Sequence, residues 1–154
     1  MRKSFLMLIV IYSALLFTGC NKPTATPHAR PAGPPKSDID FARQVFQMMA
    51  DGDINVTDML DWENLKIAGM DIGAQYKNVS SDSTRETFQE SFLRGYSKSF
   101  QSSGGNVSAM TNWREQSKDA SGTVVASNLP NGQTILFTVT SKNGLQYVST
   151  IDIK

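Results

Sequence analysis

The spacing of hydrophobic residues changes once along this chain, from about every fourth residue to about every second residue. Before the change, aromatic side chains recur at four-residue intervals, at Phe88, Phe92, Tyr96 and Phe100. That spacing is typical of one face of a helix, and we expect the stripe to lie in the core. Later segments, 123–126, 134–140 and 145–153, are rich in the β-branched and aromatic residues that favour strands. Because helices precede strands, the sequence predicts an α+β fold.

A first helix is predicted from Ser37 to Gly52. Ser37 stands three residues before Asp40, which is the spacing of a capping box with Asp in place of the usual Glu or Gln. Apolar residues then follow at helical intervals. Gly52 suits the left-handed position that closes many helices, so we interpret it as a cap.

Two more helices are predicted before the strands. The second begins at Asn55 or Thr57, whose side-chain oxygens can accept free backbone amides, and ends at Ile67. The third carries the aromatic stripe. It is predicted to begin at a capping box formed by Ser83 and Glu86.

The strands are separated by turn-forming pairs. Asn131-Gly132 lies between the first two and Asn143-Gly144 between the last two, and Asn-Gly favours the positive φ angles of a tight hairpin. A weaker strand over 107–116 is predicted to join them, giving a curved antiparallel sheet of about four strands. Gly104-Gly105 is interpreted as a hinge between the aromatic helix and the sheet. Residues 37–154 are therefore predicted to form a single domain.

The N-terminal segment 1–19 has the pattern of an export signal. Arg2 and Lys3 precede an apolar run over 5–17, which is too short for a typical membrane span. The run ends at Phe17-Thr18-Gly19-Cys20, which resembles the lipobox of bacterial lipoproteins, with Phe17 where Leu is usual. The resemblance implies cleavage between Gly19 and Cys20 and lipid on the Cys20 thiol. An ordinary signal peptide or an uncleaved anchor is the alternative, but the Ala-x-Ala pattern of ordinary cleavage sites is missing near Gly19.

The segment 20–36 is rich in proline and poor in large apolar residues, so we predict a disordered tether. At about 3.1 Å per residue it could hold the domain up to roughly 50 Å from a membrane. His28, the only histidine, lies in this segment, which argues against chemistry by a positioned imidazole. Asn21 stands where Asp resembles an inner-membrane retention signal. We therefore expect an outer membrane location, facing the periplasm, if the host has two membranes.

The charge balance argues against a polyanionic partner. Removal of Arg2 and Lys3 with the signal leaves 13 of the 15 basic residues beside 14 acidic ones, and the basic residues are scattered. Nucleic-acid binding needs a clustered basic face, so we expect no nucleic-acid partner. Cys20 is the only cysteine, so the domain must be held together without a disulfide.

The order of elements in 37–154, with helices first, a long aromatic helix and then a curved sheet, is similar to the cone-shaped roll of the nuclear transport factor 2 superfamily. The segment 46–53, an apolar stretch that ends at Gly52-Asp53, resembles the end of the first helix in such domains. The resemblance implies a cavity open at one end. Members of the superfamily use it as an acid-base active site, a ligand pocket or a partner surface, so the fold does not select one function.

Several residues are candidates for such a site. A catalytic base would be a carboxylate whose pKa an apolar wall raises. The candidates for that role are Asp58, Asp61 and Asp71, with Glu63 beside them, although no pattern singles one out. The candidates for lining a ligand pocket are Trp62, Phe92, Tyr96 and Trp113. No Gly-x-Ser-x-Gly elbow, phosphate-binding loop or other catalytic signature accompanies them.

The segment 51–60 looks like part of a calcium loop of the dockerin and EF-hand type. Its candidate ligands are Asp51, Asp53, Asn55 and Asp58. With Asp51 at the fifth position, the first and third positions become Gln47 and Met49, which are not calcium ligands. With Asp51 at the first position, Val56 replaces the required Gly. We therefore expect no bound metal and no cofactor.

These observations predict a membrane-anchored envelope lipoprotein, attached through lipid on Cys20. Its extracytoplasmic domain is predicted to be a non-catalytic binding or accessory module for an envelope protein or a small apolar ligand. Two alternatives stay open at this point: an acid-base enzyme of the same fold that uses a cavity Asp, and a calcium-stabilised interaction module.

Overall fold

The computed structural model describes residues 36–154. The signal and lipidation sites, including Gly19 and Cys20, and all of the tether except Lys36 lie outside the described residues. The elements follow one another in this order: α1 (Asp38–Asp51), the 3₁₀ helix η1 (Ile54–Met59), β1 (Lys66–Ile67), β2 (Met70–Asp71), α2 (Ile72–Lys77), α3 (Asp82–Ser102), the 3₁₀ helix η2 (Val107–Ala109), β3 (Thr111–Asp119), β4 (Gly122–Asn128), β5 (Thr134–Lys142) and β6 (Leu145–Ile153).

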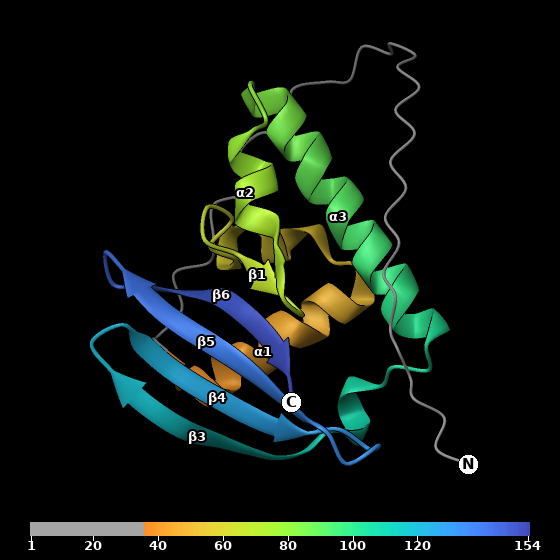
Figure 1. The fold of residues 1–154 in the computed structure, drawn as a ribbon, viewed down its shortest axis with the longest axis vertical. Helices are drawn as coiled ribbons and strands as arrows, with labels where there is room; N and C mark the ends of the chain where they lie inside the picture. The colour runs from red at the N-terminus through yellow and green to blue at the C-terminus, as the bar shows by residue number, and fades with distance from the viewer. Residues whose placement is uncertain (1–35) are drawn as a thin grey trace.

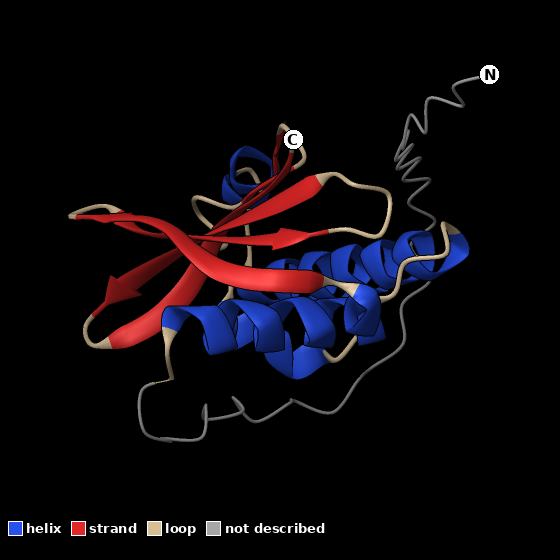
Figure 2. Ribbon diagram, turned by 90° about the horizontal axis from the view of Figure 1, so that it is seen from below, coloured by secondary structure: helices blue, strands red, loops and turns tan. Residues whose placement is uncertain are grey.

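The predicted α+β class is confirmed, but the predicted strand number is too low. Six strands form one curved sheet in the order β2-β1-β6-β5-β4-β3 (Figure 2). All neighbours are antiparallel except β1 and β6, which are parallel, so the sheet is mixed. The additional strands β1 and β2 have two residues each, which is too short for alternation to be seen in the sequence.

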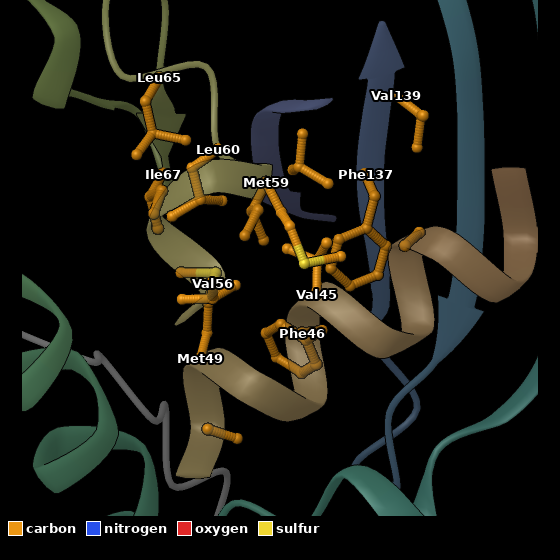
Figure 3. Close-up of a cluster of buried hydrophobic side chains, with 14 of the residues drawn as sticks. Val45, Phe46, Met49, Val56, Met59, Leu60, Leu65, Ile67, Phe137 and Val139 are labelled. Carbon is orange, nitrogen blue, oxygen red and sulfur yellow. The ribbon is translucent and has the colours of Figure 1, made fainter. Parts of the chain in front are cut away.

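Helices α1 and α3 lie on one side of the sheet, with α1 directly beneath it, whereas the short helix α2 lies beside β1 (Figures 1 and 2). Val45 and Phe46 of α1 lie beside Phe137 of β5 (Figure 3), and the rings of Phe46 and Phe137 are 5.1 Å apart. Phe46 also meets Tyr96 and Phe100 of α3 edge to face, at 6.4 and 5.4 Å. Helix α1 is therefore the common layer that joins the sheet to α3.

The first helix agrees with the prediction at both ends. Ser37 is the N-cap of α1, with its hydroxyl oxygen 3.1 Å from the backbone nitrogen of Asp40. Gly52 closes α1 in the left-handed region at φ 73°. The carbonyl of Ala50 in the last turn accepts hydrogen bonds from Ser97 and Gln101 of α3, at 2.7 and 3.1 Å. These bonds fix the C-terminal end of α1 against α3.

The predicted second helix is wrong in length and type. The segment forms only the 3₁₀ helix η1, followed by a bridge from Leu60 to Val148 and a turn that leads into β1. The backbone amide of Asp61 donates to the carbonyl of Val148 at 2.9 Å. The apolar spacing predicted helical hydrogen bonds here, but the backbone pairs with β6 instead, because tertiary contacts override local helix propensity. Helix α2, which follows β2, was not predicted.

The third helix begins earlier than predicted. Its N-cap is Ser81, whose hydroxyl oxygen lies 3.3 Å from the backbone nitrogen of Thr84, so the predicted capping box of Ser83 and Glu86 is wrong. Three serines within residues 80–83 offer alternative caps, and the spacing alone does not choose among them. The aromatic stripe of α3 is half-buried rather than fully buried, and Leu93 and Ser97 are its most buried residues.

The turns of the sheet agree with the prediction in one case of two. Asn143 and Gly144 have φ angles of 53° and 76° and join β5 to β6 as a two-residue turn. Between β4 and β5 the chain instead makes a five-residue loop, 129–133, in which only Gly132 has a positive φ. The predicted strand over 107–116 is partly wrong, because its first residues form η2 and β3 begins at Thr111.

Candidate ligand-binding cleft

A cleft with a volume of about 800 Å³ opens between the C-terminal end of α3, the end of β6 and the loop between β4 and β5. Figure 1 shows these three segments on the same side of the molecule. The apolar residues that line it are Phe46, Ile67, Ala68, Tyr96, Phe100, Leu129, Pro130, Ile135, Ile151 and Ile153. The volume lies within the range of about 300–1,000 Å³ that is typical of small-molecule sites.

The helical wall of the cleft is built from stacked aromatic rings. Tyr96 and Phe100 lie one turn apart on α3, with ring centroids 6.3 Å apart and planes inclined by 7°. Phe46 of α1 meets both rings edge to face. Ile135 and Ile151, on the neighbouring strands β5 and β6, also border the cleft, but their side chains are almost fully buried. Packed rings and strand residues give the cleft a preformed apolar surface.

The chain directly after α3 is held close to Phe100. The backbone amide of Gly105 donates to the carbonyl of Phe100 at 2.9 Å, and Gly104 adopts a left-handed φ of 76°. A Cβ atom on Gly105 would lie 2.6 Å from the Phe100 ring, well inside van der Waals contact. Glycine at 105 therefore lets the backbone pass over the ring that forms this end of the wall.

Polar side chains that carry no charge lie among the lining residues. They are Ser103, Asn106, Asn131 and Gln133, which come from the segment after α3 and from the loop between β4 and β5. The Asn131 amide donates to the Gln133 side-chain oxygen at 2.6 Å, so the two amides are paired. Within the described part of the chain, no Asp, Glu, Lys, Arg or His lines the cleft. The site combines apolar walls with neutral hydrogen-bonding groups.

Tyr96 contributes the phenol of the helical wall. Although the side chain as a whole is only half-buried, burial raises the pKa of Tyr96 above its usual value. The phenol therefore stays neutral at any physiological pH.

The four predicted pocket residues separate into two groups. Tyr96 lines the cleft, whereas Trp62, Phe92 and Trp113 are not among its lining residues. Trp62 is buried with Phe92 at 5.8 Å, and its indole nitrogen donates to the Thr57 carbonyl at 2.9 Å. Trp113 stacks on Phe137 at 5.4 Å, and among the described residues its buried indole nitrogen has no hydrogen-bond partner. Three of the four thus pack within or against the core.

The candidate carboxylates all lie away from the cleft. Asp58 and Glu63 are exposed. Asp71 is the N-cap of α2 and accepts from the backbone amide of Ala74 at 2.8 Å. Asp61 is only 7% exposed and is paired with Lys142 at 2.8 Å. In this arrangement Asp61 and Asp71 hold structural positions, and none of the four faces the apolar walls.

Three of the four candidate calcium ligands make local hydrogen bonds. Asp51 accepts from the side chain of Gln47 at 3.0 and 3.1 Å. Asp53 is the N-cap of η1 and accepts from both the backbone and the side chain of Asn55, at 3.0 and 2.8 Å. Asp58 is exposed on η1. Between residues 36 and 154, no three His, Cys, Asp or Glu side chains are grouped so that they could hold a metal ion.

Sequence reasoning missed most of the residues that form the cleft. Phe46, Ile135 and Ile151 fall within a predicted helix and predicted strands but were not singled out, and neither was Gln133. One signal was present: the last ring of the aromatic stripe, Phe100, stands just before Gly104-Gly105. A regular aromatic face that ends at paired glycines marks the place where the chain leaves the helix and exposes a ring.

None of the helices among the described residues is long and apolar enough to cross a membrane. No protein-family model, curated protein or solved structure matched this chain.

Proposed function

We propose that this protein is a lipid-anchored protein of the bacterial cell envelope whose extracytoplasmic domain binds a small apolar molecule without transforming it. The cleft carries the proposal, because its volume and apolar walls suit a small ligand. The anchoring part rests on the resemblance of residues 17–20 to a lipobox. Two or more acyl chains on one protein give stable membrane attachment.

The described fold also supports the proposed likeness to the nuclear transport factor 2 roll. Helix α1 packs against β3, β4, β5 and β6, on one side of a curved sheet. The cleft opens at one end of that arrangement, which is where the resemblance places a cavity. An acid-base enzyme would need an ionisable group facing the cleft, and the described lining residues supply only the Tyr96 phenol, with its raised pKa. Binding is therefore the function that we propose.

Ligand binding can be tested with the neutral fluorescent probe N-phenylnaphthylamine. The chain from residue 20 onward, carrying Cys20→Ser, avoids lipid and detergent and keeps every described residue. Ile153→Trp places an indole at the cleft, whereas Leu145→Trp places one at the far end of the same strand. Both positions are exposed, at 36% and 46%, so the variants are matched. We expect saturable binding that Ile153→Trp abolishes and Leu145→Trp preserves; equal binding by both variants would contradict the proposed site.

Anchoring is tested separately in the host. Mass spectrometry of the wild-type protein should find acyl chains on Cys20 and no residues before it. In the Cys20→Ser variant, mass spectrometry should find neither the acyl chains nor the cleaved N-terminus. An unmodified Cys20 in the mature protein would refute the lipoprotein assignment while leaving the binding function open.

A further inference from the structure

We infer that the cleft selects uncharged amphiphiles, such as long-chain alcohols or amides, over carboxylates and ammonium ions of the same chain length. This inference rests on the proposed binding function and names its ligand class. It follows from what the described lining residues offer, which is a set of apolar walls, a neutral phenol and uncharged hydrogen-bonding groups.

The walls determine the body of the ligand. The accessible apolar surface comes from the half-buried Tyr96, Phe100 and Leu129 and the exposed Pro130 and Ile153, and it provides dispersion contacts but few polar ones. A chain of methylenes or a flat hydrocarbon gains from this surface by leaving water. The ligand body is therefore apolar.

The polar groups determine the head of the ligand. Gln133 and Asn131 lie together in the loop between β4 and β5, with the Asn131 side chain donating to Gln133. Primary amides offer both donors and acceptors, so a second hydrogen-bond partner such as an alcohol, an amide or an ester suits them. Ser103, at the end of α3, adds a hydroxyl whose own proton goes to the Phe100 carbonyl at 2.8 Å.

The uncharged lining disfavours an ionised head group inside the cleft. A carboxylate or ammonium moved out of water needs a charged partner or several directed hydrogen bonds, and no charged side chain among the described residues lines this space. The phenol of Tyr96 does not supply an anion, because burial keeps it protonated. A charged head must stay in solvent and pull part of its chain out of the apolar walls.

A matched series tests the inference on the chain from residue 20 carrying Cys20→Ser. Dodecanol, dodecanoate and dodecylammonium compete with N-phenylnaphthylamine for the cleft, at concentrations below the solubility of dodecanol and below those at which the two ions form micelles. We expect dodecanol to bind at least about tenfold more tightly than either ion. Anilinonaphthalenesulfonate, which adds a sulfonate to a body like that of the probe, should bind correspondingly weakly. Equal affinity for all three dodecyl compounds would overturn the inference while leaving the binding function intact; failure of every probe to bind would overturn both.

Two variants of Gln133 test where the head lies. Gln133→Glu keeps an oxygen that can accept from Asn131 and adds a negative charge, whereas Gln133→Lys adds a positive one. We expect Gln133→Glu to raise the affinity for dodecylammonium and lower the affinity for dodecanoate severalfold. Gln133→Lys should change the two affinities in the opposite directions. Gln116→Glu, on exposed β3 and outside the cleft, should change none of the three affinities. Affinities that respond equally to Gln116→Glu and Gln133→Glu would refute this placement of the head.

Discussion

Asp38, in the first turn of α1, joins the helix to three strands of the sheet. Its carboxylate accepts from the Thr123 hydroxyl at 2.7 Å, from the Gln146 amide at 2.7 Å and from the Lys118 ammonium at 3.2 Å. These partners lie on β4, β6 and β3 respectively. We predict that Asp38→Ala destabilises the domain more than any other change to an exposed or half-buried acid in α1.

The magnitude follows from the burial of each partner. Thr123 is only 2% exposed, so its hydroxyl would be left without this acceptor in the interior, at a cost of about 1–3 kcal/mol. Lys118 has 62% of its side chain exposed, and its ion pair contributes only about 0–1 kcal/mol. The negative charge in the first turn of α1 adds up to about 1 kcal/mol. We therefore expect a loss of about 2–3 kcal/mol for Asp38→Ala and about half of that for Asp38→Asn.

The effect should depend on pH in a defined direction. Burial by itself would raise the pKa of Asp38, but hydrogen bonds from Thr123, Gln146 and Lys118, with the Lys118 charge, outweigh it and lower that pKa. A carboxyl whose pKa is lower in the folded state stabilises the fold above its unfolded pKa, about 3.9, and loses that contribution as the pH falls through the folded value. The difference between wild type and Asp38→Asn should thus be constant from about pH 5 to pH 8 and shrink below about pH 4.

Urea unfolding followed by tryptophan fluorescence, at a series of pH values, measures both quantities. Asp40→Asn is the matched control, because Asp40 lies in the same helical turn, is exposed and, among the described residues, has a side-chain hydrogen bond only with the cap Ser37. A loss below about 0.5 kcal/mol for Asp38→Ala, or a difference that grows as the pH falls below 4, would refute the reasoning.

Three further predictions concern residues outside the cleft. Gly73→Ala should destabilise the fold by about 1–3 kcal/mol, because its Cβ would lie 2.4 Å from the backbone carbonyl oxygen of Glu63. Gly95→Ala on α3, whose Cβ would have nothing within 4 Å, should instead stabilise the fold by up to about 1 kcal/mol. Thermal melts of the two variants measure the difference. Lys142→Ala should lower the free energy of unfolding by about 1–2 kcal/mol, because it leaves the buried Asp61 without its cation. The same change should have little effect in an Asp61→Asn background, and a double-mutant cycle measures the difference. Millimolar calcium should leave the melting temperature unchanged, and an upward shift would contradict our interpretation of 51–60.

The sequence predicts well those elements that their own residues determine. The cap at Ser37, the left-handed Gly52 and the turn at Asn143-Gly144 depend on local backbone chemistry, and all three are in place. The segment around Leu60 was predicted wrongly because its apolar residues suit a helix, while its position beside β6 makes strand-like pairing more favourable. Such a choice depends on a partner about 90 residues away, which no local pattern contains.

The cleft was harder to predict than the fold for a related reason. Its walls come from residues such as Phe46, Ile135 and Ile151, which have the same composition and spacing as core residues. These three side chains are also buried as fully as core residues, at 1–2% exposure, so burial does not distinguish them either. The cleft depends on the path of the chain around them, with Gly104 and Gly105 holding the segment after α3 against Phe100, and that geometry appears only in three dimensions.

The two ends of α1 make different contacts, so a substitution at the N-terminal end can change the stability of the fold without changing ligand affinity. Asp38 at the N-terminal end ties the helix to the strands near the turns that join β3 to β4 and β5 to β6. Phe46, about two turns further on, belongs to the cleft. Because the packed segment between them is fixed by Val45 and Phe137, a loss of the Asp38 contacts should lower the unfolding free energy without moving the cleft walls. Asp38→Asn should therefore bind N-phenylnaphthylamine with wild-type affinity. Ser97 is next in sequence to Tyr96, and Ser97→Ala removes one of the two hydrogen bonds that α3 donates to the Ala50 carbonyl, so it should weaken both stability and binding.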